Sequence, residues 1–532
     1  MRRIAKNTLQ PAPIGGLNVS DNILAMQPTD ATVLRNWFPQ PYGCQLRLGN
    51  VRHATGLGGG VKTLVEHVTA RTSSGSKLFA FADGKMFDVT APGDAARVAS
   101  LSGLTNDVWN GPAISNASGY NRILFNGADD GIWIKDDFTI ARITQDLTGT
   151  PGVGEIYGVD PDDLVGGTVH QKRVWLVQDL STKAWYLAPE AISGVATMFD
   201  FGSIFQRGGY LMALATWTVD AGAGVDDLLV AISSRGEIAI YQGTDPATAG
   251  EWQLKGVFQI GAPLSRRCVT KVEGDLYIST VFGVMSLSEA MRSSSVSSAN
   301  SPAYLSRKIQ SLVTRLTADL GGTFGWDLLF WPDNNMVVVN VPMLSGSGQL
   351  VYSTVTKGWA QFDNWDALCW NTFENGMVYG DRNGNVWRAW EGYTDGAIQS
   401  DSTTITDGNP ITAAAQTAFS YLQSGAIVKH PKLIRPTFVG PISMRFGIAV
   451  NPDFVYNDVN VPSGASGSSD AALWGSAIWG TSKWAGTASA TLHSWSAVAG
   501  IGSSFGVRVA VYEAQPVVWA GYELLHEDGF GI

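Results

Sequence analysis

The sequence predicts an all-β protein built around a β-propeller, and three observations lead to that prediction. A short pattern, in which two apolar runs flank a turn, occurs seven times between Leu78 and Trp390. The turns of the clearest copies contain Asp-Gly or Asn-Gly, which tolerate the positive φ that tight hairpins require. The copies follow one another about every 50 residues, the spacing of propeller blades made of antiparallel strands.

The repeat is regular except near its end. Its hairpins are expected at residues 78–87, 123–134, 174–187, 228–241, 276–287, 337–362 and 377–387. Their turns lie near 84, 129, 181, 235, 282, 346 and 384, so the steps between turns are 45, 52, 54, 47, 64 and 38. The two irregular steps flank the hairpin at 337–362, which we therefore expect to share a blade with a neighbour.

The propeller is not expected to fill the chain, because 532 residues exceed the roughly 250–300 at which one core stops growing. Residues 1–55 are rich in Pro and Gly and predict an extended N-terminal arm. We expect the propeller over 56–400 and a polar linker over 401–415. Strand-like alternation at 418–459 and 505–525 predicts a C-terminal β domain over 416–532, a sandwich.

One segment breaks the strand pattern and predicts a helix near 303–320. Its apolar residues recur at helical spacing, and Ser301-Pro302 and Gly321-Gly322 bracket it as start and stop signals. The stripe consists of Leu305, Ile309, Leu312, Val313, Leu316 and Leu320. We expect this helix, inserted between blades, to pack over the propeller or to contact another subunit.

Composition limits the classes of partner. A net charge of −10 argues against binding the nucleic-acid backbone, which needs clustered Lys and Arg, although DNA could pass without being held. Only 15 % of residues are charged, against about 25 % in a typical soluble domain, which suits a subunit buried among others. Cys44, Cys268 and Cys369 form no disulfide or zinc pattern, so a reducing compartment is expected. We expect neither a signal peptide nor a membrane span.

Several motifs invite a catalytic or metal-binding interpretation, and none supports it. Gly502-Ser-Ser-Phe-Gly506 fits a nucleophile elbow but precedes a strand rather than a helix. Paired carboxylates at 129–130, 136–137, 162–163 and 226–227 could serve a propeller glycosidase, yet adjacent Asp residues on a strand face opposite ways and suit turns. Asp381-Arg-Asn-Gly-Asn385 lacks the Glu of a calcium loop and suits a hairpin.

The remaining candidates are scattered or structural. The six His residues show no zinc spacing, and Gly56 to Gly60 lacks the Lys-Ser/Thr of a phosphate loop. Trp474, Trp479 and Trp484 recur every five residues and are candidates for stacking on sugars, or for packing a β domain or subunit interface, which we favour. We therefore expect no enzymatic activity, no cofactor and no metal.

The two ends of the chain carry a family resemblance. The N-terminal part runs Pro13-Ile-Gly-Gly-Leu-Asn-Val-Ser-Asp-Asn22, then Met26-Gln-Pro-Thr-Asp-Ala-Thr-Val-Leu-Arg-Asn-Trp-Phe-Pro39 and Gly43-Cys-Gln-Leu-Arg-Leu-Gly49. The C-terminal part has Ile434-Arg-Pro-Thr-Phe438, the Trp-Gly repeat at 474–485 and Tyr522-Glu-Leu-Leu-His-Glu-Asp-Gly-Phe-Gly531. These segments resemble the tail hub (nozzle, or packaged-DNA stabilisation) proteins of short-tailed bacteriophages.

This resemblance implies a six-bladed propeller in each subunit and a ring of six subunits in the virion. The ring would extend the DNA channel below the portal and adaptor proteins, next to a tail needle or plug and to tail spikes or fibres, after assembly in the bacterial cytoplasm. The leading hypothesis is thus a structural tail protein that retains and then releases the genome. The alternatives are a receptor- or glycan-binding propeller at the tail tip and a propeller glycosidase.

Overall fold

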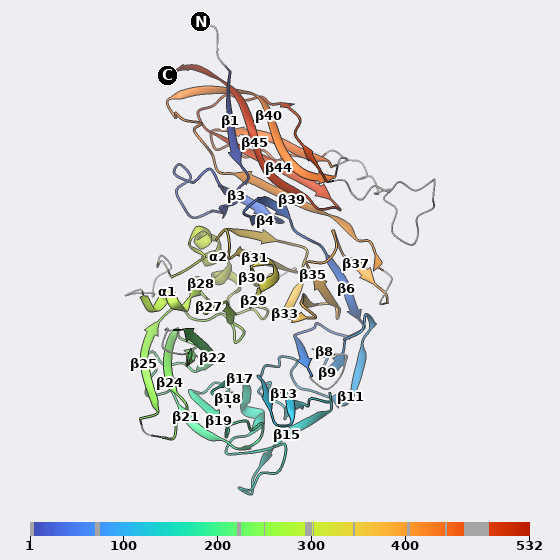
Figure 1. Cartoon of the computed structure of the whole chain (residues 1–532), viewed down its shortest axis with the longest axis vertical. Coiled ribbons are helices and arrows are strands. Elements are labelled where there is room, and N and C mark those ends of the chain that lie inside the picture. Colours follow the sequence, from blue (N-terminus) through green and yellow to red (C-terminus); the bar gives the residue numbers. More distant parts are fainter. Residues whose placement is uncertain are drawn as a thin grey trace.

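The structure, a computed structural model, consists of a ring of β-sheets and a β-sandwich above it (Figure 1). Apart from two helices and three single 3-10 turns, its described elements are strands, so the all-β class is confirmed. The described residues are 5–531 without 70–74, 221–224, 249, 293–300, 302, 344–345, 402–404, 442–443 and 462–488.

Seven sheets of the described chain form the blades of the propeller. Blade 1 contains β7 (Thr63–Val68), β8 (Ser76–Ala82), β9 (Lys85–Asp88) and β11 (Ala96–Ser102). Blade 2 contains β12 (Ala113–Asn116), β13 (Gly119–Leu124), β14 (Gly131–Ile134) and β15 (Ile140–Asp146), extended by β16 (Glu155–Tyr157) and β20 (Gly194–Val195). Blade 3 contains β17 (Leu164–His170), β18 (Arg173–Gln178), β19 (Lys183–Tyr186) and β21 (Thr197–Asp200).

The other four blades complete the ring. Blade 4 contains β22 (Leu211–Asp220), β23 (Val225–Ser233), β24 (Glu237–Gly243) and β25 (Trp252–Gln259), and blade 5 contains β26 (Val269–Val272), β27 (Asp275–Thr280) and β28 (Gly283–Ser286). Blade 6 contains β29 (Asp327–Trp331), β30 (Met336–Met343), β31 (Gly346–Ser353) and β32 (Trp359–Phe362). Blade 7 contains β33 (Ala367–Phe373), β34 (Gly376–Asp381), β35 (Val386–Ala389) and β6 (Asn50–Thr55).

Each hairpin predicted from the sequence supplies the second and third strands of one blade, and the segment 337–362 also includes the fourth strand, β32. The turn between β8 and β9 shows the cause, because Asp83 and Gly84 both adopt positive φ, 52° and 66°. We expected the hairpin at 337–362 to share a blade with a neighbouring hairpin. It instead forms blade 6 together with β29. The described propeller therefore has seven blades, and the six blades implied by the family resemblance are wrong.

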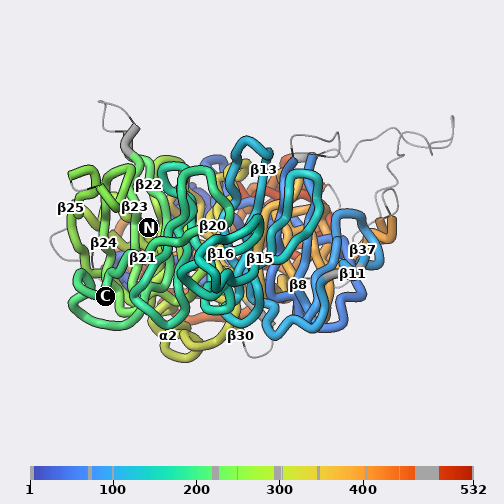
Figure 2. Tube along the Cα trace, turned by 90° about the horizontal axis from the view of Figure 1, so that it is seen from below, coloured from blue at the N-terminus to red at the C-terminus, as the bar shows by residue number. Residues whose placement is uncertain are grey.

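The ring closes through neighbouring inner strands and through the N-terminal part of the chain. The inner strand of each blade contacts the next blade around the ring, and β33 of blade 7 contacts β7 of blade 1. The fourth strand of blade 7 is β6, which pairs antiparallel with β35 although more than 300 residues separate them. Figure 2 shows the ring edge-on, with blade 4 at one side and blade 1 at the other.

The irregular step of 64 residues has a physical cause, namely two helices between blades 5 and 6. The predicted helix is α2 (Gln310–Leu320), preceded by a 3-10 turn at Arg307–Ile309, so its α-helical part starts later than expected. Its buried Val313 belongs to the core, and it contacts β28 and β30, which confirms packing over the propeller. A second helix, α1 (Leu287–Arg292), is too short to show a periodic pattern in the sequence.

Two sheets pack face to face in the sandwich. The first contains β1 (Ala5–Pro11), β4 (Trp37–Gln40), β5 (Gly43–Leu46), β40 (Ile427–Pro441), β42 (Ser489–Leu492), β43 (Ser496–Ala497) and β45 (Val518–Gly531). The second contains β2 (Gly16–Leu17), β3 (Asp30–Arg35), β36 (Thr394–Asp395), β39 (Asn409–Thr417), β41 (Phe446–Pro452) and β44 (Phe505–Glu513). Alternation on β44 places Val507, Val509 and Val511 in the core and exposes Tyr512.

The sandwich and blade 6 form a continuous structure. Strand β3 pairs with β32 of blade 6 on one side and with β39 on the other, so one sheet of ten strands runs through both parts. A single hydrophobic cluster likewise includes Trp519 of the sandwich and Val338 of blade 6. Because the sandwich and blade 6 share strands and a hydrophobic core, the junction between them is a packed interface rather than a flexible linker.

Two segments expected to be irregular contribute strands to this junction. Residues 5–55, expected as an extended arm, supply six strands, and β1 pairs with β45 over its full length. The expected linker 401–415 enters the sandwich as β39 from Asn409 onward, because Ile411, Ala413 and Ala415 alternate toward the core. Short strands β10 (Gly93–Asp94), β37 (Ala397–Gln399) and β38 (Ile405–Thr406) cover the edge of blade 7 beside β6.

Gly16 makes the closest approach between the N-terminal part and blade 6, and its replacement by Ala is expected to be costly. Its φ is +82°, and a Cβ atom would lie 2.4 Å from the backbone nitrogen of Trp359. We expect Gly16→Ala to lower the free energy of unfolding by about 2–5 kcal/mol, measured by urea denaturation. Gly56 is the control, because its φ is +85° but a Cβ atom there would meet nothing within 4 Å. Equal losses in both variants would show that the close approach is unimportant.

Candidate functional site on the propeller axis

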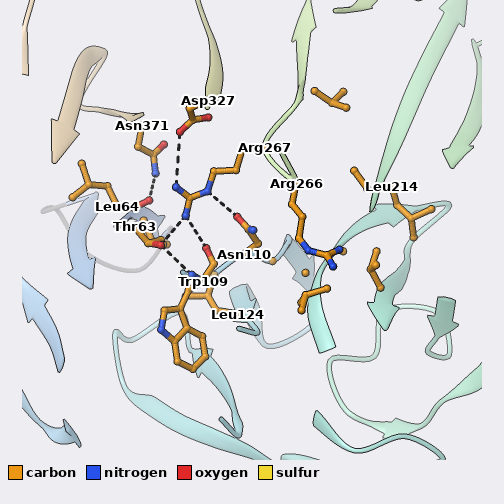
Figure 3. Close-up of a pocket in the computed structure, with 18 of the residues that line it drawn as sticks. Thr63, Leu64, Trp109, Asn110, Leu124, Leu214, Arg266, Arg267, Asp327 and Asn371 are labelled. Carbon is orange, nitrogen blue, oxygen red and sulfur yellow. Dashed lines mark hydrogen bonds and ion pairs between the residues drawn. The ribbon is translucent and has the colours of Figure 1, made fainter. Parts of the chain in front are cut away.

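The inner strands enclose a cavity of about 310 Å³ that every blade helps to line; we call it the axial cavity. It lies where the blades converge, so its wall combines residues that are far apart in the sequence (Figure 3). Thr63, Arg122, Val165, Leu214, Val269, Asp327 and Asn371 line it from blades 1 to 7 in turn.

Arg267, two residues before β26, is the central side chain of the axial cavity. Its Nε donates to Asn110 Oδ1 at 3.2 Å, and one terminal nitrogen donates to the carbonyl of Lys62 at 3.0 Å. The other terminal nitrogen donates to Thr63 Oγ1 at 2.7 Å and to the Trp109 carbonyl at 3.4 Å. Arg267 thereby connects blade 5 to blades 1 and 2, as the dashed lines in Figure 3 show.

Asp327 is the acidic partner of Arg267 from blade 6. Its Oδ2 lies 3.9 Å from a terminal nitrogen of Arg267, and it accepts backbone hydrogen bonds from Leu328 and Trp370. Burial raises the pKa of Asp327 above its ordinary value, while the Arg267 charge and these hydrogen bonds act in the opposite direction. The positive charge of Arg267 therefore favours the ionised form of the buried Asp327 carboxylate.

Arg266, which also precedes β26, contacts blades 3 and 4 rather than blades 1 and 2. It pairs with Asp179 of the blade 3 hairpin at 2.5 Å and donates to the carbonyl of Met212 at 3.1 Å. Arg266 and Arg267 also line a second cavity of about 500 Å³, on the side where the inner strands begin. The two arginines thus lie between the two cavities and obstruct the axis.

A third cavity, of about 590 Å³, lies where β7, β29 and β33 end. Its wall contains Glu66, Asp333 and Glu374, and burial raises the pKa of Glu66. The wall of this third cavity, formed by blades 1, 6 and 7, is therefore acidic, whereas two arginines lie between the first two cavities.

The polar groups in the wall of the axial cavity hold neighbouring blades together. Its lining contains no Ser, Cys or His among the described residues. Thr63 supplies the hydroxyl group of the lining. Its oxygen already donates to the carbonyl of Asp107 and accepts from Arg267. No group of three or more His, Cys, Asp or Glu side chains in the described ranges is placed to hold a metal ion.

The motifs weighed in the sequence occupy structural positions. Ser503 and Ser504 both donate backbone hydrogen bonds to Asp453, and β44 follows them, so the Gly-x-Ser-x-Gly motif opens a strand. Asp381 Oδ1 accepts from the backbone of Asn383 and Asn385 in the turn between β34 and β35. Residues 56–60 connect β6 to β7.

Three of the four pairs of carboxylates, those at 129–130, 136–137 and 162–163, lie in connections between strands, but the pair at 226–227 lies within strand β23 rather than in a hairpin turn as expected. Asp129 accepts hydrogen bonds from Thr105 and Asn126, and Asp136 accepts from the backbone of Tyr120. Asp227 accepts from the Thr218 hydroxyl group across the blade 4 hairpin. Asp162 lies near four other Asp side chains, and burial together with their charges raises its pKa.

The histidines and cysteines are dispersed. His53, His67 and His170 each bond to a backbone carbonyl oxygen, and burial lowers the pKa of all three. The three cysteines are free and buried, and burial raises the pKa of each thiol. Trp474, Trp479 and Trp484, the candidates for stacking on sugars, lie outside the described residues.

Sequence reasoning missed the axial site entirely. Arg266 and Arg267 appear in the sequence as an ordinary basic pair, and nothing local marks them as axial. The available signal was positional, since both precede the first strand of a repeat.

No helix of the described chain is long and apolar enough to span a membrane.

Comparisons with known proteins give no family. No family model matches the chain, and no curated protein matches it. The solved structure of the computationally designed Ika8 protein is 10 % identical and covers 64 % of this chain and 100 % of its own, with a TM-score of 0.34. YCF48 bound to D1 peptide is 10 % identical over 66 % of this chain and 98 % of its own, with a TM-score of 0.36.

A Bacteroides fragilis protein provisionally assigned as a 6-phosphogluconolactonase is similar to the same degree. It is 10 % identical over 65 % of this chain and 94 % of its own, with a TM-score of 0.33. At such scores the inference about function must come from the residues of this chain.

Proposed function

We propose that this chain is a structural subunit of a bacteriophage tail, of the nozzle or hub type, without enzymatic activity. It would form a ring of six copies that extends the DNA channel below the portal and adaptor and helps to retain and then release the genome. Its neighbours would be a needle or plug and tail spikes or fibres, and it would assemble in the bacterial cytoplasm.

The observation that carries this proposal is how the two ends of the chain fold together. The segments that resemble tail hub proteins lie at 13–49 and 434–531, almost 400 residues apart. In the structure, β5 and β1 both pair with β45, and β45 pairs with β40. Segments that form one structural unit are expected to resemble a family together, which supports the resemblance as a property of the fold.

The obstructed axis bears on the path of DNA in this proposal. The axial cavity is small and Arg267 bridges it, so a duplex would not pass through one propeller. The conduit is instead the space that a ring of subunits would enclose. The chain's net charge of −10 supports a wall that DNA slides past, since like charges repel at short range.

Exposed apolar side chains support contacts between subunits. Leu147 and Val153, between β15 and β16, are 80 % and 87 % exposed, and Leu254 and Val257 protrude from the outer strand β25. Exposed apolar groups of this kind are commonly buried in assemblies. A ring requires such contacts to be heterologous, so that they join different faces of neighbouring subunits.

The test is to assemble phage particles without this chain. We expect such particles to lose their packaged DNA, measured as nuclease-sensitive DNA, and images of complete tails to show a closed ring of the protein. Filled, nuclease-resistant particles lacking the chain would overturn the proposal.

The alternative function, a receptor- or glycan-binding propeller, is favoured by one observation. A cavity of about 410 Å³ between blade 7 and the sandwich is lined by Trp387 together with Asp and Asn side chains, a combination suited to sugar hydroxyl groups. Under this alternative the purified chain would bind host polysaccharide, and Trp387→Ala would abolish that binding. Absence of binding by the unaltered chain would exclude it.

A further inference from the structure

Arg122 is the one arginine of the axial cavity that forms no ion pair with the described residues. It lies on β13, where pairing with β12 and β14 fixes its backbone, and it lines the cavity wall. Its Nε is buried without a hydrogen-bond partner in the described structure. A buried guanidinium nitrogen without an acceptor is unusual, because the loss of hydration is not offset.

The other charged side chains that line the cavity form ion pairs. Arg266 pairs with Asp179, and Arg267 is held by Asp327 and by its four neutral acceptors. Once Asp179 and Asp327 are matched to Arg266 and Arg267, Arg122 is the arginine of the wall that remains. The acid that interacts electrostatically with Arg122 is Glu66, on β7.

Glu66 compensates Arg122 only in part. Burial lowers the pKa of Arg122, and the negative charge of Glu66 raises it by a smaller amount. Glu66 instead accepts a hydrogen bond from the backbone of Glu374 and lines the cavity at the ends of the inner strands. The charge of Arg122, which no ion pair of the described residues neutralises, therefore lies at the wall of the axial cavity.

We propose that the axial cavity binds a compact oxyanion, namely a phosphate or carboxylate group, through the guanidinium of Arg122. A planar guanidinium matches the oxygen spacing of such groups and pairs with them through two parallel hydrogen bonds. The volume of about 310 Å³ is at the lower end of the range for small-molecule sites, roughly 300–1,000 Å³. This inference is independent of any role in a phage tail.

The test uses the full chain with inorganic phosphate and succinate as probes, at constant ionic strength maintained with chloride. We expect calorimetric titration to show one site per chain for one of the two probes, and the two arms separate phosphate from carboxylate recognition. Arg122→Gln is expected to weaken binding about 10- to 100-fold, the effect of losing charge-assisted hydrogen bonds. Arg315→Gln, which removes an exposed arginine of α2, is the matched control and should bind normally.

No binding of either probe at 10-fold above physiological concentrations, about 10–50 mM, would overturn the proposal, because a built site saturates well below that level. Equal affinity of Arg122→Gln and the unaltered chain would also overturn it. If Arg122→Gln does not fold, Arg122→Lys replaces it, since that variant keeps the charge but loses the two-pronged geometry, and unchanged affinity would then count against the site.

Discussion

Replacing Arg267 by Met is expected to lower the free energy of unfolding by about 3–5 kcal/mol, because it leaves the buried Asp327 carboxylate without its counter-charge. The substitution also removes the donors that satisfy Asn110, Lys62 and Thr63 in blades 1 and 2. Urea denaturation followed by tryptophan fluorescence would measure the change. Arg315→Met on the exposed face of α2 is the control, with an expected change within about 0.5 kcal/mol.

The same variant has an expected pH dependence. Burial already raises the pKa of Asp327, and loss of Arg267 raises it further, because that charge favours the ionised form. A carboxyl group whose folded pKa is raised stabilises the fold in its protonated form, and this stabilisation is lost as pH rises through the folded pKa. The deficit of Arg267→Met should therefore shrink as pH falls below neutral.

A second substitution separates the charge effect from the lost packing. Asp327→Asn in the Arg267→Met background should recover much of the stability at neutral pH, since no buried charge remains. If the double variant is no more stable than Arg267→Met alone, then the uncompensated carboxylate is not the cause.

The second large effect is expected at Arg47, which lies between β5 and β6 and joins the N-terminal part to both domains. Its side chain is fully buried, and its terminal nitrogens donate to Asp395 Oδ1 and Oδ2 at 2.7 and 2.6 Å. The remaining donors bond to Asn36 Oδ1 and to the carbonyls of Leu48 and Asp363. Arg47→Met is expected to cost about 3–5 kcal/mol, measured by the same denaturation.

The neighbouring Arg35 provides a matched control for Arg47. Its ion pair with Asp363 spans 3.3 Å, but its side chain is 59 % exposed. We expect Arg35→Met to cost less than about 1 kcal/mol, because solvent screens an exposed pair. Arg47→Lys should lie between the two, since Lys keeps the charge without the two-pronged geometry. A similar cost for Arg35→Met and Arg47→Met would contradict the role of burial.

The sequence predicted those parts of the fold that are encoded locally. A hairpin such as β8–β9 is specified by alternation and by the Asp83-Gly84 turn, all within a dozen residues. Helix α2 was predicted for the same reason, since its stripe and its boundary signals are contiguous. The seven hairpins were counted correctly, and the error in blade number came from the family resemblance.

What the sequence could not predict depends on partners that are distant in the chain. The sequence of strand β3 contains no Pro or Gly and is compatible with a strand. Its partners β32 and β39, however, lie more than 300 residues away, so the local sequence does not identify them. The axial site is the extreme case, because Arg267 meets Asn110, Thr63 and Asp327 only when the ring is complete. Arg122 could not be recognised as lacking an ion pair among the described residues until its neighbours were known.

The pairing of the first strands with the last ones sets the order in which this chain can fold. Strand β6 must wait for β35, and β1 must wait for β45, at the far end of the chain. At about 5–20 residues per second of synthesis, the first residues leave the ribosome tens of seconds before these partners exist. Ring closure and sandwich formation are therefore late events with high contact order, and the emerging N-terminal strands need protection from aggregation until translation ends.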